Sequence, residues 1–347
     1  MVSATTSRRA QDVPQRRSPD VPHRSLRRAG LIAWALVLVG WSLTRGLPVD
    51  RTSQTLLWLG LLLAANVGTT WARKGRVLLD WLPFVTFLYV YDYSRGLAHW
   101  FGATTHVQVG VDADRLIGGG QVPTVALQDW LYDPRHIHWY DVLAAVVYTS
   151  HFFVAWTIAV VLYLRSPAEW ARWVRRLLVL SYAGLVTFVV FPAAPPWYAA
   201  KAGLIDPVAR ISGRGFSALH LHAAGVLLEK GQAAANNVAA IPSLHAGLPL
   251  LITMFFWSRL RLTGRLLLVV YTVAMGAALV YSGEHYVVDL LAGYAYVVGA
   301  VVAVGRWERR RDARPAALVA EEQRGTVEPI FSPATEMAPG WRTTRSS

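Results

Sequence analysis

The chain lacks cysteine altogether and has only three lysines among its 347 residues. Without cysteine it forms no disulfide, and catalysis by a thiolate is excluded. Acidic residues are also few: 21 Asp and Glu stand against 34 Lys and Arg, which gives a formal net charge of +13. A nucleic-acid partner would fit that charge, but the basic residues fall in short clusters between apolar runs. In a membrane protein such clusters set the orientation, so we expect a lipid bilayer and no nucleic acid as partner.

Long apolar runs dominate the chain. Hydrophobic residues make up 54% of it, and its mean hydropathy is +0.33. A helix that crosses a bilayer needs about 20 mostly apolar residues. The predicted fold is therefore all-α, a polytopic integral membrane bundle of about eight transmembrane helices. One run begins near residue 30, and the others cover about 54–71, 77–92, 141–164, 177–193, 242–258, 265–281 and 286–304. The first run also resembles a secretory signal, but it has no clean cleavage site, and we interpret it as an uncleaved span.

The two ends of the chain are polar and show no apolar period. We predict a disordered basic cytoplasmic tail at 1–29 and a second disordered cytoplasmic tail at 306–347. Between them we expect two accessory transmembrane helices at 30–76, followed by a six-helix membrane domain at 77–305.

Short loops rich in arginine set the expected orientation. They are 72–76, 165–176 and 258–265, and they alternate with the predicted spans. Placing these loops in the cytoplasm puts both tails there as well. The long segments 92–140 and 194–241 then lie on the outer face, as does the turn between the last two spans. We therefore expect a multi-pass protein of the cell membrane.

Two histidines come together at the outer face in this topology. His245 lies in the heptapeptide IPSLHAG, one turn into its span, and His285 begins the last span. Asp289 follows four residues after His285, so these two residues share one helix face. Ionisable groups in membrane helices are costly and tend to mark function. The alternative is that each histidine is an interfacial polar residue and that His285 and Asp289 only satisfy each other.

These segments resemble signature motifs of a known family. PSLHAG (242–247) followed by HYVVDLLAG (285–293) is similar to the second and third motifs of the type-2 phosphatidic acid phosphatase superfamily. FPAAPPWY (191–198) resembles the branch that includes inositol phosphorylceramide synthases. The resemblance covers the last six spans, about 77–304, and implies that they form the six-helix catalytic core.

The resemblance implies a role for each matching residue. His285 is the nucleophile and forms a phosphohistidine, Asp289 orients and stabilises its ring, and His245 acts as general acid and then as base. Ser243 stands at or near a helix N-cap, where backbone N–H groups bind anions, and is a candidate phosphate ligand. His151, about ten residues into the fourth span, either faces the same cavity or only packs in the bundle. No cofactor and no metal are expected, because the histidine pairs in RHIHW and LHLHAAG have no acidic partner at ligand spacing.

Two cations that bind phosphate in the superfamily are missing here. The usual first motif, Lys-x6-Arg-Pro, is absent, and Leu279 stands where the third motif has an arginine. Arg95, three residues after Asp92, is the first candidate replacement, because arginine grips phosphate through two parallel hydrogen bonds. The two residues could equally be only an interfacial ion pair. Arg214, flanked by glycines, is the second candidate. Arg210 and Lys201 are further candidates, although loop charges of this kind are more often solvated.

The predicted function is that of a membrane-embedded lipid phosphotransferase or phosphatase with its active site on the extracytoplasmic side. Transfer of a phospho-head group, of the inositol-phosphate kind, from a phospholipid or polyprenyl phosphate to an alcohol is favoured by the FPAAPPWY resemblance. Capture of the phosphohistidine by water would make the protein a lipid phosphate or polyprenyl phosphate phosphatase. A non-enzyme alternative is a transporter with a buried His/Asp relay, which would spread ionisable residues through the membrane thickness rather than gather them at one end.

Overall fold

The protein is described here by a computed structural model that covers residues 24–45, 48, 50–94, 104–219 and 238–325. Helices account for all the regular secondary structure in these ranges, apart from two isolated bridges that join His106 to Ala193 and Ala193 to Ala239. The helices are α1 (Arg24–Arg45), α2 (Arg51–Ala65), α3 (Trp71–Ser94), α5 (Gln108–Ile117), α6 (Pro123–Leu131), α7 (Trp139–Arg165), α8 (Pro167–Val190), α9 (Pro196–Lys201), α10 (Gly215–Ala218), α12 (Leu244–Phe256), α13 (Leu262–Tyr281) and α14 (Val287–Gly325). A 3-10 turn, Trp257–Arg259, follows α12.

Each predicted span falls on a helix, and the prediction of an all-α polytopic membrane protein is confirmed. Within the described ranges, five helices are both long and apolar enough to cross a bilayer, namely α1, α7, α8, α13 and α14 as far as Ala313. The other three predicted spans correspond to α2, α3 and α12. Of these, α2 has 15 residues and α12 has 13, and the first turns of α3 carry the charged loop residues.

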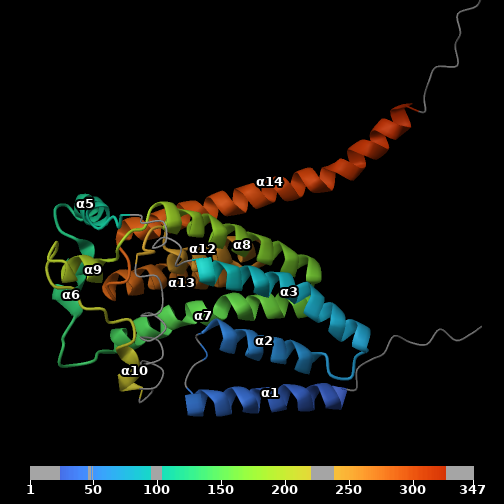
Figure 1. Ribbon diagram of the computed structural model, residues 1–347, viewed down its shortest axis with the longest axis horizontal. Coiled ribbons are helices and arrows are strands. Elements are labelled where there is room, and N and C mark those ends of the chain that lie inside the picture. The colour runs from blue at the N-terminus through green and yellow to red at the C-terminus, as the bar shows by residue number, and fades with distance from the viewer. Residues whose placement is uncertain (1–23, 46–47, 49, 95–103, 220–237, 326–347) are drawn as a thin grey trace, which may run out of the picture. The chain divides into compact units, whose positions relative to one another are not determined.

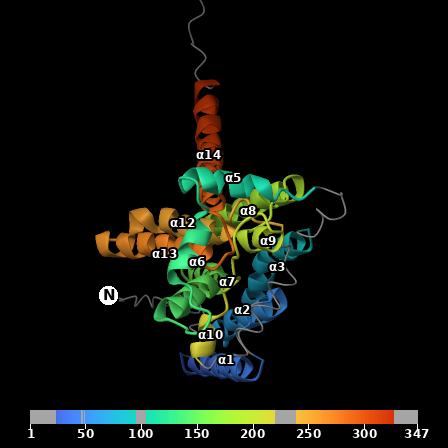
Figure 2. The ribbon, with the colours of Figure 1, turned by 90° about the vertical axis from the view of Figure 1, so that its left-hand side faces the viewer.

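The larger of two structural units, Met1–Val301, holds the bundle and the candidate site. In it α7 contacts α8, α12 and α13, while α1 contacts α2. The short helices α5, α6 and α9 gather at one end of the bundle, which Figure 1 places at the left and Figure 2 turns toward the viewer. Large side chains fill the core, and Trp81, Trp173 and Leu251 are fully buried there. The three short helices α5, α6 and α9, called the outer layer from here on, cover the end of the bundle where α13 ends and α14 begins.

Two of the arginine-rich loops lie at the same end of the bundle, as the predicted topology requires. Arg259, which follows α12, donates a hydrogen bond to Glu169 in the first turn of α8. Glu169 also accepts from Arg172 at 2.9 Å. His245 is at the opposite end of α12 from Arg259, so the IPSLHAG segment and these basic loops lie on opposite sides of the bundle.

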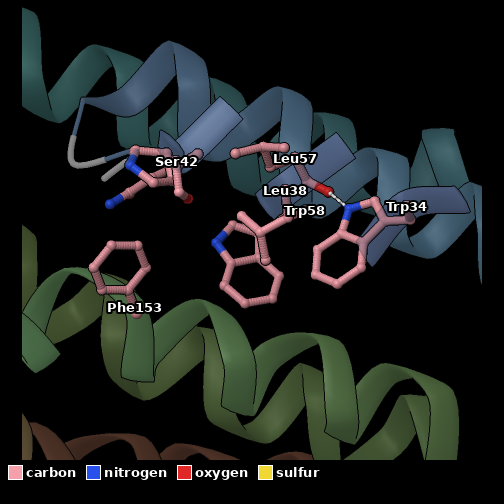
Figure 3. Close-up of a pocket in the computed structure, with 8 residues that line it drawn as sticks. Trp34, Leu38, Ser42, Leu57, Trp58 and Phe153 are labelled. Atoms are coloured by element: carbon pink, nitrogen blue, oxygen red, sulfur yellow. Dashed lines mark hydrogen bonds between the residues drawn. The ribbon is translucent and has the colours of Figure 1, made fainter. Parts of the chain in front are cut away.

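The two accessory helices attach to the core mainly through apolar side chains. Trp34 Nε1 donates a hydrogen bond to the carbonyl oxygen of Leu57 at 2.7 Å, which ties α1 to α2. Gln54 Nε2 donates to the carbonyl oxygen of Phe152 at 2.9 Å, which ties α2 to α7. Between these three helices lies a cavity of about 240 Å³ (Figure 3). It is lined by Trp34, Leu38, Ser42, Pro48, Gln54, Leu57, Trp58 and Phe153.

The ends of the chain differ in how they compare with the predicted tails. The N-terminal tail lies outside the described residues as far as residue 23, and α1 begins at Arg24. At the other end α14 continues to Gly325, through twenty residues that the sequence analysis assigned to a disordered tail. This stretch is rich in Ala, Arg and Glu, which are good helix formers. The second structural unit, Val302–Ser347, holds this part of α14.

Candidate active site

Ser243 begins the helix that carries His245. It is the N-cap of α12, with extended backbone angles, and its Oγ accepts a hydrogen bond from the N–H of Ala246 at 3.2 Å. Its own N–H donates to the carbonyl oxygen of Asp289 at 2.9 Å. Ser243 is fully buried. The IPSLHAG segment is therefore fastened both to its own helix and to the first turn of α14.

Asp289 holds the ring of His285 through one nitrogen. His285 Nδ1 lies 3.2 Å from Asp289 Oδ2, and the same oxygen accepts from the N–H of Tyr286 at 2.9 Å. Asp289 is fully buried and His285 is 7% exposed. When the proton sits on Nδ1 and points to the carboxylate, the lone pair is on Nε2, which is the nitrogen available for attack.

Three histidine rings lie close together, one from α7, one from α12 and one from the turn before α14. The ring centroids of His245 and His285 are 5.8 Å apart, and those of His151 and His245 are 4.0 Å apart. Tyr148 stacks on His245 with a centroid distance of 5.2 Å. His151, for which two placements were open, thus has its ring packed against that of His245.

Gly293 allows α14 to lie against the PSLH segment. A Cβ atom at this position would be 2.3 Å from the carbonyl oxygen of Ser243, far inside van der Waals contact. A Cβ at Gly247 would meet Val297 at 3.2 Å, so that glycine also belongs to a close helix crossing. These two positions explain how His245 and His285, forty residues apart in sequence, share one site.

Asp114 is a residue that the sequence analysis missed. It lies in α5 of the outer layer, and its two carboxylate oxygens accept from the N–H groups of Val287 and Val288, each at 2.9 Å. Burial raises the pKa of Asp114, and the two hydrogen bonds oppose that rise. An N-terminal carboxylate suits the helix dipole. Asp289 accepts from the N–H of Tyr286 in the same region. The N–H groups at the start of α14 that have no acceptor within the helix are therefore bound by two aspartates and are not available to phosphate.

A second cluster, which the sequence did not indicate, surrounds Glu284, the residue before His285. Glu284 accepts from Arg210 Nε at 2.9 Å and from Arg210 Nη2 at 3.0 Å, and Ser212 Oγ donates to it at 2.7 Å. The guanidinium of Arg210 lies 4.9 Å over the ring of Trp197, in the FPAAPPWY segment. Arg210 is therefore not a solvated loop charge, because its partner Glu284 is itself buried.

The turn that carries Glu284 is clamped on two sides. The N–H of Trp197 donates to the carbonyl oxygen of Gly283 at 3.3 Å, and that of Ile211 donates to Ser282 at 3.2 Å. Gly283 has a positive φ of 75°, and a Cβ there would also approach Val208 within 2.9 Å. A glycine is thus required at this turn.

The candidate phosphate ligands are placed in different surroundings. Arg95 lies outside the described residues. Asp92 pairs with Arg51 of α2, with Arg51 Nε 2.6 Å from Asp92 Oδ2. Arg214 donates to the carbonyl oxygens of Asp133 and His136 and so holds the segment before α7. Arg95, Asp92 and Arg214 remain predictions as phosphate ligands. In the part of the chain that the structure covers, no group of three or more His, Asp or Glu side chains is placed to hold a metal ion.

Comparisons with known proteins agree with this geometry. The model of the PAP2 superfamily matches residues 119–303, a range that contains PSLHAG and HYVVDLLAG and more than half of the chain. A curated protein of Bacteroides thetaiotaomicron named phosphoinositol dihydroceramide synthase is 27% identical over 276 residues, which are 76% of this chain and 86% of that protein. No solved structure matches the chain significantly. The chain therefore belongs to the PAP2 superfamily and is a membrane-bound phosphatase or phosphotransferase.

Proposed function

We propose that the protein transfers a phospho-head group, of the inositol-phosphate kind, from a phospholipid to the hydroxyl group of an acceptor alcohol. The observation that carries this proposal is the His245–His285–Asp289 arrangement, in which two histidines on neighbouring helices lie close and one of them is held by a buried carboxylate. The name of the Bacteroides relative, phosphoinositol dihydroceramide synthase, supports a transferred group that contains inositol and an acceptor that is a lipid.

The reaction has two steps that exchange one bond to phosphorus. In the first, Nε2 of His285 attacks the phosphorus, and the bond from phosphorus to the lipid oxygen breaks. His245 gives its proton to that leaving oxygen. Asp289 stabilises the positive charge that forms on the phosphorylated ring. In the second step His245 takes the proton of the acceptor hydroxyl, whose oxygen attacks phosphorus and restores free His285.

The orientation of the site is part of the proposal. The arginine-rich loops 165–176 and 258–265 support a cytoplasmic position for their end of the bundle. His245 and His285 are at the other end, under the outer layer of α5, α6 and α9, and we assign that end to the extracytoplasmic side. Polar head groups lie at this depth of a bilayer, so a lipid phosphate can reach the histidines without leaving the membrane.

The mechanism also requires cations around the phosphate. A transferring phosphoryl group needs positive charge near its oxygens. Arg95 stays our first candidate for this role and Arg214 the second. The N–H groups of Leu244 and His245 at the start of α12, and the hydroxyl of Ser243, are further candidate donors to the phosphate.

The experiment that tests the proposal uses purified protein and a panel of radiolabelled phospholipids and lipid phosphates, with and without alcohol acceptors such as a ceramide. A labelled lipid product that depends on the alcohol supports transfer. Release of water-soluble phosphate that is independent of every alcohol would instead identify a lipid phosphate or polyprenyl phosphate phosphatase and refute the transferase proposal.

A further inference from the structure

The two-histidine mechanism gives no role to the cluster of side chains around Glu284. It combines a buried carboxylate, a guanidinium, a hydroxyl and an indole, contributed by Glu284, Arg210, Ser212 and Trp197. Glu284 directly precedes His285, and neighbouring Cα atoms are about 3.8 Å apart. The N–H groups of Glu284 and His285 both donate to the carbonyl oxygen of Leu279, so the cluster and the histidine belong to one turn.

We propose that Glu284, Arg210 and Ser212 form a subsite for a polyhydroxylated head group that the transferred phosphate carries. This inference rests on the transferase function proposed above and names the class of head group that the site selects. A cyclic polyol offers several hydroxyl groups on one ring, and each can donate to a carboxylate and accept from a guanidinium at the same time.

The charge balance of the cluster favours a neutral polyol over the phosphate itself. Arg210 directs both Nε and Nη2 to the two oxygens of Glu284, so its positive charge is matched by a carboxylate at 2.9 and 3.0 Å. A phosphate placed against Arg210 would also meet the negative charge of Glu284, and like charges at such distances repel. Hydroxyl groups carry no charge and meet no such penalty.

The cluster is rigid and can be reached from outside. The turn 282–284 is clamped by Trp197 and Ile211, so Glu284 has a fixed position relative to His285. The side chain of Arg210 is 27% exposed, whereas that of Glu284 is 8% exposed. The Nε1 atom of Trp197 is buried, and no acceptor for it lies among the described residues. A preformed set of fixed donors and acceptors discriminates strongly against a ligand without matching hydroxyl groups.

Two variants separate the head group from the phosphate. Glu284→Gln keeps the shape of the side chain and removes its charge, and Ser212→Ala removes one hydrogen bond to Glu284 and keeps the ion pair. Ser217→Ala is the matched control, because it removes the same hydroxyl from an exposed position of α10. Full-length protein in mixed micelles is given phosphatidylinositol or phosphatidic acid, and diacylglycerol release reports the first step with either lipid.

We expect Glu284→Gln to lower kcat/KM for phosphatidylinositol by about tenfold to a hundredfold, the loss typical of a hydrogen bond to a charged group. The value for phosphatidic acid should stay constant or rise, because Arg210 loses its counter-charge. Ser212→Ala should shift the ratio in the same direction by less, and Ser217→Ala should leave both values unchanged.

An equal fall for both lipids would overturn the subsite, since it would indicate a role for the cluster in binding phosphate or in holding the turn. An unchanged value for phosphatidylinositol would overturn it as well, and so would a wild-type protein that prefers phosphatidic acid. Failure of the underlying transferase function looks different, because the wild type would then form no alcohol-dependent lipid product at all.

Discussion

Replacing Asp289 by asparagine removes the negative charge that is hydrogen-bonded to His285 and changes little else. In the native protein Asp289 Oδ2 accepts from His285 Nδ1 at 3.2 Å and from the N–H of Tyr286 at 2.9 Å. An amide oxygen in the same position can accept both hydrogen bonds, so the ring keeps its orientation and its proton on Nδ1. The amide nitrogen then takes the place of Oδ1, which has no partner among the described residues.

The expected cost has two parts. A buried amide N–H₂ without an acceptor lowers the free energy of unfolding by about 1–3 kcal/mol. The loss of charge should also act on catalysis, because the positive ring of the proposed phosphohistidine would no longer be stabilised. In systems with an oriented histidine the corresponding change lowers kcat by up to about 10⁴-fold, partly because the tautomer is lost. Since the tautomer is kept here, we expect a fall in kcat of about 10²–10³.

Rapid quench into alkaline detergent, with lipid labelled at phosphorus, measures both the rate and the intermediate. The asparagine variant should form the acid-labile, base-stable phosphoprotein slowly, while KM changes little because Asp289 is buried away from substrate. Asp289→Ala should be slower still, since it also removes the orientation of the ring. Phosphoprotein formation at the wild-type rate in Asp289→Asn would refute the reasoning that this carboxylate supports the nucleophile.

Four further predictions follow from the site. His285→Ala should fold but give neither turnover nor trapped phosphoprotein; undiminished label in this variant would rule out His285 as the nucleophile. Asp114→Asn should lower kcat and thermal stability, because only one α14 N–H keeps an oxygen acceptor. Burial raises the pKa of Asp114, so the folded state keeps the proton on this carboxyl to a higher pH than the unfolded state does. This group therefore makes the free energy of unfolding fall as the pH rises above about 3.8. Unfolding scans of Asp114→Asn at several pH values should lack this pH dependence. Gly293→Ala should cost about 1–3 kcal/mol of stability and most of the activity, whereas Gly299→Ala, with open space at its Cβ, should behave as wild type in the same assays. A thiol introduced by Thr263→Cys should not react with a membrane-impermeant reagent in intact cells. Labelling at this position would show that the protein has the opposite orientation in the membrane.

The parts of the structure that could be predicted from the sequence are those that depend on neighbouring residues. Apolar runs predicted the helices, and the four-residue spacing of His285 and Asp289 predicted their contact, which is present although α14 begins two residues after His285. Ser243 was recognisable as a helix start by its side chain and by the proline before it.

The contacts that the sequence could not predict join distant segments. Asp114 and Val287 are 173 positions apart, and Arg210 and Glu284 are 74 positions apart. Nothing in the local sequence distinguishes Asp114 and Arg210 from solvated charged residues. Only the packing of the outer layer on the end of the bundle decides that both become partners of the segment that carries His285.

The cap that Asp114 places on α14 also has a bearing on how the enzyme is made. Its partners are the backbone N–H groups of Val287 and Val288, 173 and 174 positions later in the chain, and until that segment is made Asp114 lacks these partners. Burying a carboxylate without a partner is costly. We therefore expect the outer layer to pack on the bundle only together with the segment that carries His285, so that a chain without that segment has neither.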